Sequence, residues 1–299
     1  MPATQFICPD NYKVDIGTCL AGCRMGRRCL TLPTLITLAA SERPWNGKPS
    51  TTMMLNGPMV EYLKTKYEYA INPRERAYAL LGSEHHERLA AISGDWIAEQ
   101  RVGGAQTGTP DLVEPDELIP GGHILTDYKT YGSFRVAKML GLTKKTRKHP
   151  TEVYKSSGKW GKRGDPKTVT YFEIDPNLID QNSEELQLNH YRTLLEAQGL
   201  TITHMQIQVT VRDGGLQIAR QRGVDAPIYL IPIRRLDDTY IQDYFQSRGN
   251  AIIEAISEDK EPRLCNEEES WDKRKCKDYC DVASLCQQGK AVLSGEIRV

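Results

Sequence analysis

The sequence predicts an α/β protein in which a mixed central sheet is flanked by helices. Helical patterns precede a short strand hairpin, strands and helices follow in turn, and no solenoid repeat runs through the chain. The length of 299 residues favours one main core with appendages over two large domains. We therefore expect one principal sheet.

The first third of the chain is predicted to be mainly helical. Residues 30–41 form the first expected helix, and Pro, Gly and Ser mark residues 41–52 as a loop. Residues 52–70 and 73–100 are expected as two longer helices, the second with a proline in its first turn. One face of the longer helix is apolar at helical spacing. It carries Tyr78, Leu81, His85, Leu89, Ile92 and Trp96.

Strands are more frequent in the rest of the chain. A strand hairpin is expected over 108–130, and a short helix follows at 131–141. Residues 143–167 form the one concentrated basic segment, expected as a loop, in which nine Lys or Arg residues meet only Glu152 and Asp165. The remaining predicted elements are a strand at 168–175, a helix at 183–199, strands at 202–215 and 226–236, and a helix at 237–257.

Composition limits the classes of function. The 39 basic and 39 acidic side chains give a formal net charge of zero, which argues against a protein that coats nucleic acid through bulk charge. The first residues lack the basic and apolar regions of a secretory signal, and the apolar run at 30–40 is too short and proline-interrupted to span a bilayer. We therefore expect a soluble, cytoplasmic protein without membrane contact.

Eight cysteines fall into two groups with the same spacing. Steps of 11, 4 and 6 residues separate the members of each group. The N-terminal quartet is Cys8, Cys19, Cys23 and Cys29, and the C-terminal quartet is Cys265, Cys276, Cys280 and Cys286. In a reducing compartment such quartets favour zinc or iron–sulfur ligation over disulfides, and buried reduced thiols are the alternative. The sequence leaves open whether each quartet closes on itself or shares ligands with the other.

The strand hairpin carries charges that a buried hairpin does not need. Asp127 and Lys129 are two residues apart and share a strand face, and Asp111 on the other strand can reach the same spot. Two carboxylates beside an ammonium suit a hard divalent cation and a lysine that steadies an attacking water or a developing anion. The pattern indicates phosphodiester hydrolysis, and a surface cross-strand ion pair is the simpler alternative.

Four motifs in order make the chain resemble the PD-(D/E)xK nuclease superfamily, specifically its RecB-like exonuclease branch. The motifs are Gly82 to His86 on a helix, Gly108 to Asp111, Asp127-x-Lys129, and Gln187 with Tyr191 four residues later on one helix face. The resemblance covers about residues 30 to 290. It implies a restriction-endonuclease-like nuclease core at 31–264, between cysteine-rich metal-binding termini at 1–30 and 265–299.

The resemblance also implies residue roles. The metal ligands for Mg or Mn would be His86, Asp111, Asp127 and the carbonyl of Tyr128. Lys129 would act on the attacking water and the scissile phosphate, and Gln187 and Tyr191 would contact the substrate strand and the active site. The motif selects His86, whereas helical spacing puts His85 at the centre of the apolar face. We follow the motif and expect His85 to be a packed core residue.

A subset of this branch, including CRISPR-adaptation nucleases and AddB-type helicase-nucleases, joins its termini through a [4Fe-4S] cluster. One cysteine before the core and three after it bind that cluster. Here Cys276, Cys280 and Cys286 match the three cysteines after the core, although the spacing from Cys276 to Cys280 is one residue longer than usual. Cys23 or Cys29 would be the single cysteine before the core. The chain departs from the family in four further cysteines, which leave room for a second centre such as zinc. They are Cys8, Cys19, Cys265 and the spare member of the Cys23 and Cys29 pair.

The sequence thus predicts a Mg- or Mn-dependent DNA nuclease, an exonuclease or end-trimming enzyme for single-stranded DNA, with a structural iron–sulfur centre. The basic segment is predicted to bind substrate backbone and Trp160 to stack on bases. Its cations are Lys144, Lys145, Arg147, Lys148, Lys159, Lys162 and Arg163. The alternatives are a non-catalytic nucleic-acid-binding module with zinc-bound termini and a cysteine-rich metal or redox protein. Expected partners are DNA and the proteins of a CRISPR-adaptation, phage or recombination complex.

Overall fold

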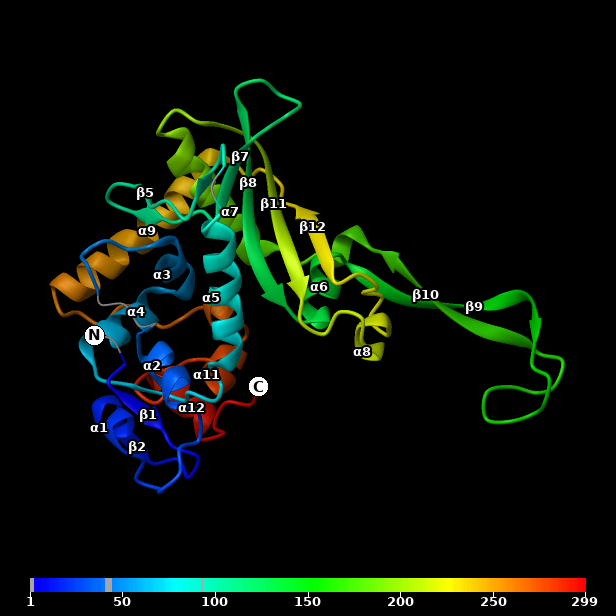
Figure 1. The fold of residues 1–299 in the computed structure, drawn as a ribbon, viewed down its shortest axis with the longest axis horizontal. Coiled ribbons are helices and arrows are strands. Elements are labelled where there is room, and N and C mark those ends of the chain that lie inside the picture. The colour runs from blue at the N-terminus through cyan, green and yellow to red at the C-terminus, as the bar shows by residue number, and fades with distance from the viewer. Residues whose placement is uncertain (1–2, 41–44, 93) are drawn as a thin grey trace.

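A five-stranded mixed sheet forms the centre of the protein, as a computed structural model describes it over residues 3–40, 45–92 and 94–299 (Figure 1). The strands in sheet order are β12 (Ile228–Pro232), β11 (Thr201–Val211), β8 (Gly122–Tyr131), β7 (Leu112–Pro115) and β4 (Ile97–Ala98). Strands β8 and β11 run parallel, and the other neighbours pair antiparallel. The prediction of a mixed sheet flanked by helices is confirmed.

The main core lies between this sheet and helices α6 (Ser133–Met139) and α7 (Asn182–Glu196). Strand β11 alternates buried and partly exposed side chains along most of its length, which is the period of a strand with one covered face. Leu125 and Ile207 of the sheet join Val136 and Leu188 of the helices in one buried cluster. Because Asp127 is two residues from Leu125, it shares that covered face.

A second group of helices packs beside the sheet. It contains α3 (Thr51–Asn56), α4 (Pro58–Lys66) and α9 (Asp238–Ser257), and α4 and α9 pack against each other. The predicted single helix over 52–70 is wrong, because Gly57 takes a φ of 97° and Pro58 opens a new helix that ends at Lys66. Across the described ranges, no helix combines the length and apolar character needed to cross a bilayer.

Helix α5 (Ala77–Ala90) is shorter than the helix predicted over 73–100. Residues 97–98 form strand β4 instead, because pairing with β7 places them at the edge of the sheet. The predicted apolar face is also wrong, since Leu81, Ile92 and Trp96 are exposed, and the side chain of Tyr78 lies outside the described residues. The helix stands beside β8, and this contact positions its polar residues (Figure 1).

The two ends of the chain fold together, where the blue and red segments meet in Figure 1. The N-terminal elements are β1 (Gln5–Ile7), β2 (Lys13–Asp15), α1 (Ile16–Ala21) and α2 (Leu32–Ala40), with β3 (Ala70–Ile71) completing a small sheet. The C-terminal helices are α10 (Glu267–Ser270), α11 (Arg274–Asp278) and α12 (Gln287–Leu293). Phe6, Leu35, Leu63 and Val282 belong to one buried cluster, so both ends share a core with α2 and α4.

A long two-stranded ribbon, the β9–β10 arm, projects from the body (Figure 1). Strands β9 (Leu142–Val153) and β10 (Pro166–Ile174) pair antiparallel, with a register shift near Pro166. The predicted loop over 143–167 is therefore wrong for most of its length. Val, Thr, Tyr and Phe in β10 favour an extended ribbon. The other short elements are β5 (Val102–Gly103), β6 (Thr107–Gly108), the 3-10 helix Pro176–Leu178 and α8 (Gln217–Arg220).

Candidate active site

Two aspartates meet at the start of the central hairpin. The pairing of Leu112 with Thr126 places Asp111, the residue before β7, opposite Asp127 of β8. One carboxylate oxygen of Asp111, Oδ2, accepts a hydrogen bond of 2.7 Å from the backbone N–H of Tyr128. Both aspartates are buried, at 7% and 1% exposure. Two buried carboxylates thus lie on paired strands of the sheet.

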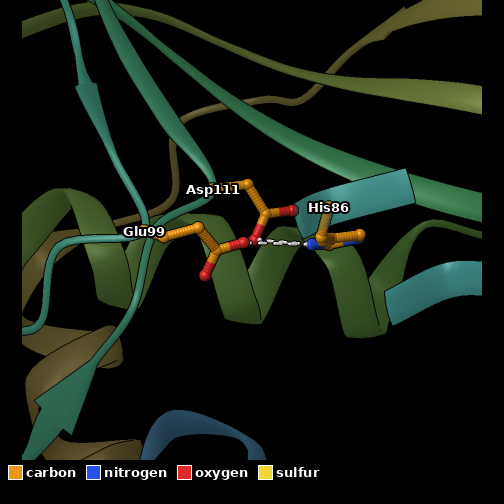
Figure 2. Close-up of side chains that lie close together, drawn as sticks. All are labelled: His86, Glu99 and Asp111. Carbon is orange, nitrogen blue, oxygen red and sulfur yellow. Dashed lines mark hydrogen bonds and ion pairs between the residues drawn. The ribbon is translucent and has the colours of Figure 1, made fainter. Parts of the chain in front are cut away.

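Helix α5 brings His86 to the same place (Figure 2). The His86 Nδ1 atom lies 3.2 Å from Glu99 Oε1 and 3.4 Å from Asp111 Oδ1. The Nε2 atom lies 3.0 Å from the backbone oxygen of Tyr128, to which it donates when protonated. The hydrogen bond to Asp111 raises the pKa of His86 to about 9, against the opposing effect of burial. The imidazolium therefore neutralises part of the surrounding negative charge.

His85 faces a different environment from His86. Its ring packs edge-on against the Tyr128 ring at 5.7 Å, and its Nε2 atom is buried without a hydrogen-bond partner among the described residues. The sequence expectation of a core histidine holds only in part, because His85 packs on a ring but its side chain is half-buried. His86, selected by the motif, is the histidine that contacts the carboxylates.

Glu99 is a site residue that the sequence reasoning missed. It follows β4, takes a positive φ of 50°, and its N–H donates to the Asp111 carbonyl at 3.3 Å. One ligand atom from each of His86, Glu99 and Asp111 lies within 4.8 Å of the other two (Figure 2). Nothing in the sequence around Glu99 marks it, because only the pairing of β4 with β7 brings it here.

Asp127 and Lys129 form the most buried charged pair of the site. The Lys129 Nζ atom lies 2.5 Å from Asp127 Oδ2, so the ammonium and the carboxylate form a direct ion pair. Burial raises the pKa of Asp127 to about 6, although Lys129 opposes the shift. Burial lowers the pKa of Lys129, but Asp127, Asp111 and Glu184 together outweigh that effect and the net shift is upward.

Helix α7 supplies the layer behind Asp127. Gln187 Nε2 donates to Asp127 Oδ1 at 3.3 Å and to the Tyr191 hydroxyl at 3.0 Å. Tyr191 is only 4% exposed, and burial raises the pKa of its hydroxyl well above the usual range. Tyr191 thus packs inside the molecule, and Gln187 links it to the carboxylate.

A glycine explains how two of the sequence motifs fit together. A Cβ atom on Gly108 would lie 2.6 Å from the Tyr191 ring, a contact too close to tolerate. The first residue of the motif that ends at Asp111 therefore makes room for the last residue of the motif on α7. Gly82 has no such role in the described structure, because a Cβ atom there meets nothing within 4 Å.

The predicted nucleic-acid-binding residues lie on the β9–β10 arm. Lys144, Lys145, Arg147 and Lys148 are exposed on β9, and the tip carries Lys159, Lys162 and Arg163. Arg147 lies over the Tyr171 ring at 5.2 Å. Trp160 at the tip is 78% exposed. The arm thus presents cations and an aromatic ring to solvent, away from the carboxylates.

A cavity of about 470 Å³ opens where the arm joins the body. Its walls combine aromatic rings and cations. They include Phe134, Lys138, Lys144, Phe172 and Arg222. Lys138 and Arg222 both lie over the Phe134 ring, at 5.2 and 5.7 Å. The mixture suits a flat, negatively charged ligand.

The cysteines all carry free thiols, and among the described residues none of them belongs to a group of three ligand atoms within 4.8 Å of one another. Burial, and then the neighbouring Cys29, Cys8 and Cys23, raise the pKa of Cys19. Burial raises the pKa of Cys265 to about 12, with further contributions from Glu269, Cys286 and Cys280. The neutral thiol is therefore favoured at Cys19 and at Cys265.

Comparisons with known proteins add little to this geometry. No family model matches the chain, and no curated protein matches it. Among solved structures, the crystal structure of a protein designated SSO0001 is similar, with 14% sequence identity and a TM-score of 0.40. The alignment covers 84% of this chain and 91% of that one. A similarity of this degree defines neither a shared fold nor a shared activity.

Proposed function

We propose that this protein is a Mg- or Mn-dependent DNA nuclease with a PD-(D/E)xK-type core of the RecB-like branch. The observation that carries the proposal is the buried pair of Asp127 and Lys129. Asp127 interacts with the second buried carboxylate, Asp111, as well as with Lys129, and carboxylates buried together are costly unless enough cations balance their charge. The imidazole of His86 and the carboxylate of Glu99 lie at the same place.

The donor set fits a hard divalent cation. Its candidate ligands are His86, Glu99, Asp111, Asp127 and the Tyr128 carbonyl, which are mostly oxygen donors. When bound, Mg or Mn would polarise a phosphate oxygen and lower the pKa of a water. His86 must release its proton to bind a metal, because imidazole coordinates in its neutral form.

The remaining residues position the reaction. Lys129 carries an ammonium beside Asp127, where it can hold the attacking water and balance negative charge that develops on the phosphate. Gln187 fixes the orientation of the Asp127 carboxylate through its hydrogen bond to Oδ1. Burial of Asp127 excludes water from one side of the site and strengthens these interactions.

The β9–β10 arm supports DNA as the substrate. Its exposed lysines and arginines match a phosphate backbone, and Trp160 offers a stacking surface for an unpaired base. Because the formal net charge of the chain is zero, binding would depend on this local patch rather than on bulk attraction. We therefore propose single-stranded DNA, or duplex DNA with free ends, as the substrate class. The expected setting is a CRISPR-adaptation, phage or recombination complex.

The second candidate is a nucleic-acid-binding module without catalysis. It is favoured by the separation of the basic arm residues from the carboxylates, since the arm would bind phosphates even if the site were inactive. The two candidates differ in what the carboxylate site contributes to activity.

A cleavage assay separates them. End-labelled single-stranded DNA, duplex DNA and RNA of equal length would be incubated with Mn, Mg or EDTA and the protein. The proposal predicts metal-dependent cleavage of DNA that is lost in Asp127→Asn and retained in Glu117→Gln, an exposed carboxylate of the same hairpin. Tight DNA binding without cleavage in any metal would favour the second candidate.

A further inference from the structure

We propose that the cavity at the base of the β9–β10 arm binds one unpaired nucleotide of a DNA strand. The flat base would lie against the aromatic rings of the cavity, and the neighbouring phosphates would lie beside its cations. The volume of about 470 Å³ falls within the range of small-ligand sites, about 300 to 1,000 Å³. This inference rests on the proposed function for the choice of DNA as the ligand, but it does not depend on cleavage.

Helix α6 and the turn after it form one wall of the cavity, where the arm leaves the body (Figure 1). Phe134, Ala137 and Lys138 are three and four residues apart, so they share one side of the helix. Gly141 follows with a φ of 63°, and a Cβ atom there would lie 2.4 Å from the Asp175 carbonyl oxygen. The Gly141 carbonyl in turn accepts a hydrogen bond of 2.8 Å from the Asp175 N–H. Backbone contacts that require glycine therefore hold this wall in place.

A second wall comes from the arm and from the segment after α8. Lys144 on β9 pairs directly with Phe172 on β10, so their side chains share one face of the ribbon. The Phe172 ring packs on the backbone of Gly223, where a Cβ atom would lie 2.6 Å from the ring. Arg222, the residue before this glycine, also lines the cavity. One aromatic ring and two cations are thus placed together by strand pairing and by a glycine.

The side chains that line the cavity carry an excess of positive charge. Asp180 is the one carboxylate among the described lining residues, and Arg135 pairs with it at 2.8 Å. Arg222 lies 3.6 Å from Asp213, which balances part of its charge, and 35% of the Arg222 side chain stays exposed. The two lysines of the cavity are exposed as well. These cations match the phosphates on either side of a bound base.

The Phe134 ring favours a flat partner. It remains 51% exposed, although Lys138 lies over it at 5.2 Å and Arg222 at 5.7 Å. Nucleobases stack on aromatic rings and on guanidinium groups, so this combination suits a base. A base inside a duplex is already stacked on both faces and paired at its edge. The cavity therefore fits an unpaired nucleotide rather than duplex DNA.

Ordered side chains connect the cavity with the candidate active site. Asp180 at the cavity pairs with Arg135, which also pairs with the buried Glu184 at 2.5 Å. Glu184 accepts a hydrogen bond of 2.9 Å from the hydroxyl of Tyr131, which is two residues from Lys129 on β8. A short series of contacts thus separates the cavity from Lys129. A nucleotide in the cavity and a phosphate at Lys129 would belong to one bound strand.

Binding measured in EDTA tests the proposal separately from cleavage. The parent protein and Phe134→Ala would be titrated with a labelled oligothymidine and with an abasic strand of equal length. Phe134→Ala should bind the oligothymidine about fivefold or more weakly, because one base loses its stacking partner. Its affinity for the abasic strand should stay that of the parent protein. Tyr240→Ala is the matched control, since Tyr240 is a 52% exposed aromatic residue on α9, and it should bind both strands like the parent.

Equal weakening of both strands in Phe134→Ala, or no weakening, would overturn the role of the cavity and leave the nuclease proposal standing. A protein that shows the expected difference but cuts no DNA would keep the cavity assignment and lose only the nuclease proposal. If neither strand bound the parent protein, the cavity assignment and the DNA substrate would both be wrong.

Two further measurements identify the ligand and its position. Thymidine monophosphate should compete far more weakly than the unlabelled strand, because it lacks the neighbouring phosphates. Competition as strong as that of the strand would assign the cavity to a free nucleotide instead and overturn the proposal. A strand that carries 5-iodouracil should crosslink under ultraviolet light to Phe134 or Phe172. Crosslinks confined to Trp160 at the tip of the arm would contradict binding in the cavity.

Discussion

The central sheet and the β9–β10 arm both carry lysines on strands, but they surround them differently. Lys129 in the sheet has a side chain only 21% exposed and pairs with the buried carboxylate of Asp127. Lys144 and Lys145 on the arm are exposed, because a two-stranded ribbon has no covered face over most of its length. The same residue type is thus desolvated in one region and solvated in the other.

The difference shows where a single charged side chain is essential and where it can be replaced. A buried charge keeps its partner because leaving either one alone costs several kcal/mol, on the order of 3 to 5. An exposed charge interacts weakly with its neighbours and is screened by salt. We therefore expect single substitutions to be severe in the sheet and mild on the arm.

The largest expected effect comes from Lys129. Lys129→Ala should lower metal-dependent DNA cleavage by at least about a hundredfold, because the reacting phosphate loses its nearby ammonium. Lys148→Ala on the arm is the matched control and should stay within a few-fold of the parent protein. Cleavage rates at saturating Mn measure both. Equal rates for the two variants would remove Lys129 from the mechanism.

The next effect concerns the pH dependence of stability in the metal-free protein. His86 has a pKa of about 9 when folded, above its unfolded value of about 6.5. Its contribution to the free energy of unfolding is therefore fully present below pH 6.5. That contribution, about 3 kcal/mol, is lost as the pH rises through about 9. Urea denaturation in EDTA at low and high pH would measure it.

The His86→Asn variant should lose the pH-dependent part of the stability. The His85→Asn variant should be less stable at every pH, because its packing is weaker. A pH dependence that survives in His86→Asn would assign it to another group.

A third effect separates tight packing from open surface. Gly108→Ala should destabilise the protein by about 1 to 3 kcal/mol, because its Cβ atom would press on the Tyr191 ring. Gly158→Ala at the tip of the arm is the control, since a Cβ atom there meets nothing within 4 Å. Thermal unfolding of both variants tests the difference. A Gly108→Ala variant as stable as the parent protein would show that α7 can move away from the added methyl group.

The smallest effect per residue is expected on the arm. Replacing Lys144, Lys145, Arg147 and Lys148 by Gln should weaken DNA binding and flatten its dependence on salt, by a slope of about 0.7 to 0.9 for each phosphate that the arm no longer neutralises. Cleavage of DNA at saturating concentration should change little. A salt dependence equal to that of the parent protein would mean that the arm does not touch the backbone.

Much of the fold could be predicted from local pattern. The helices near 30–41, 183–199 and 237–257 and the strands of the central hairpin lie close to where periodicity places them. The errors share a cause. The helix expected over 73–100 stops at Ala90 because residues 97–98 pair with β7, and the basic loop is a ribbon because β10 pairs with β9. Pairing between two separate segments leaves no periodic signal in either one.

By itself the sequence determined which residues share a strand or a helix face. It set Asp127 beside Lys129 and Gln187 beside Tyr191, because side chains repeat every two residues in a strand and about every four in a helix. The tertiary structure alone decided that Glu99 reaches His86 and that Tyr191 packs on Gly108. These contacts depend on strand register and chain reversals, which are fixed only when distant segments pack together.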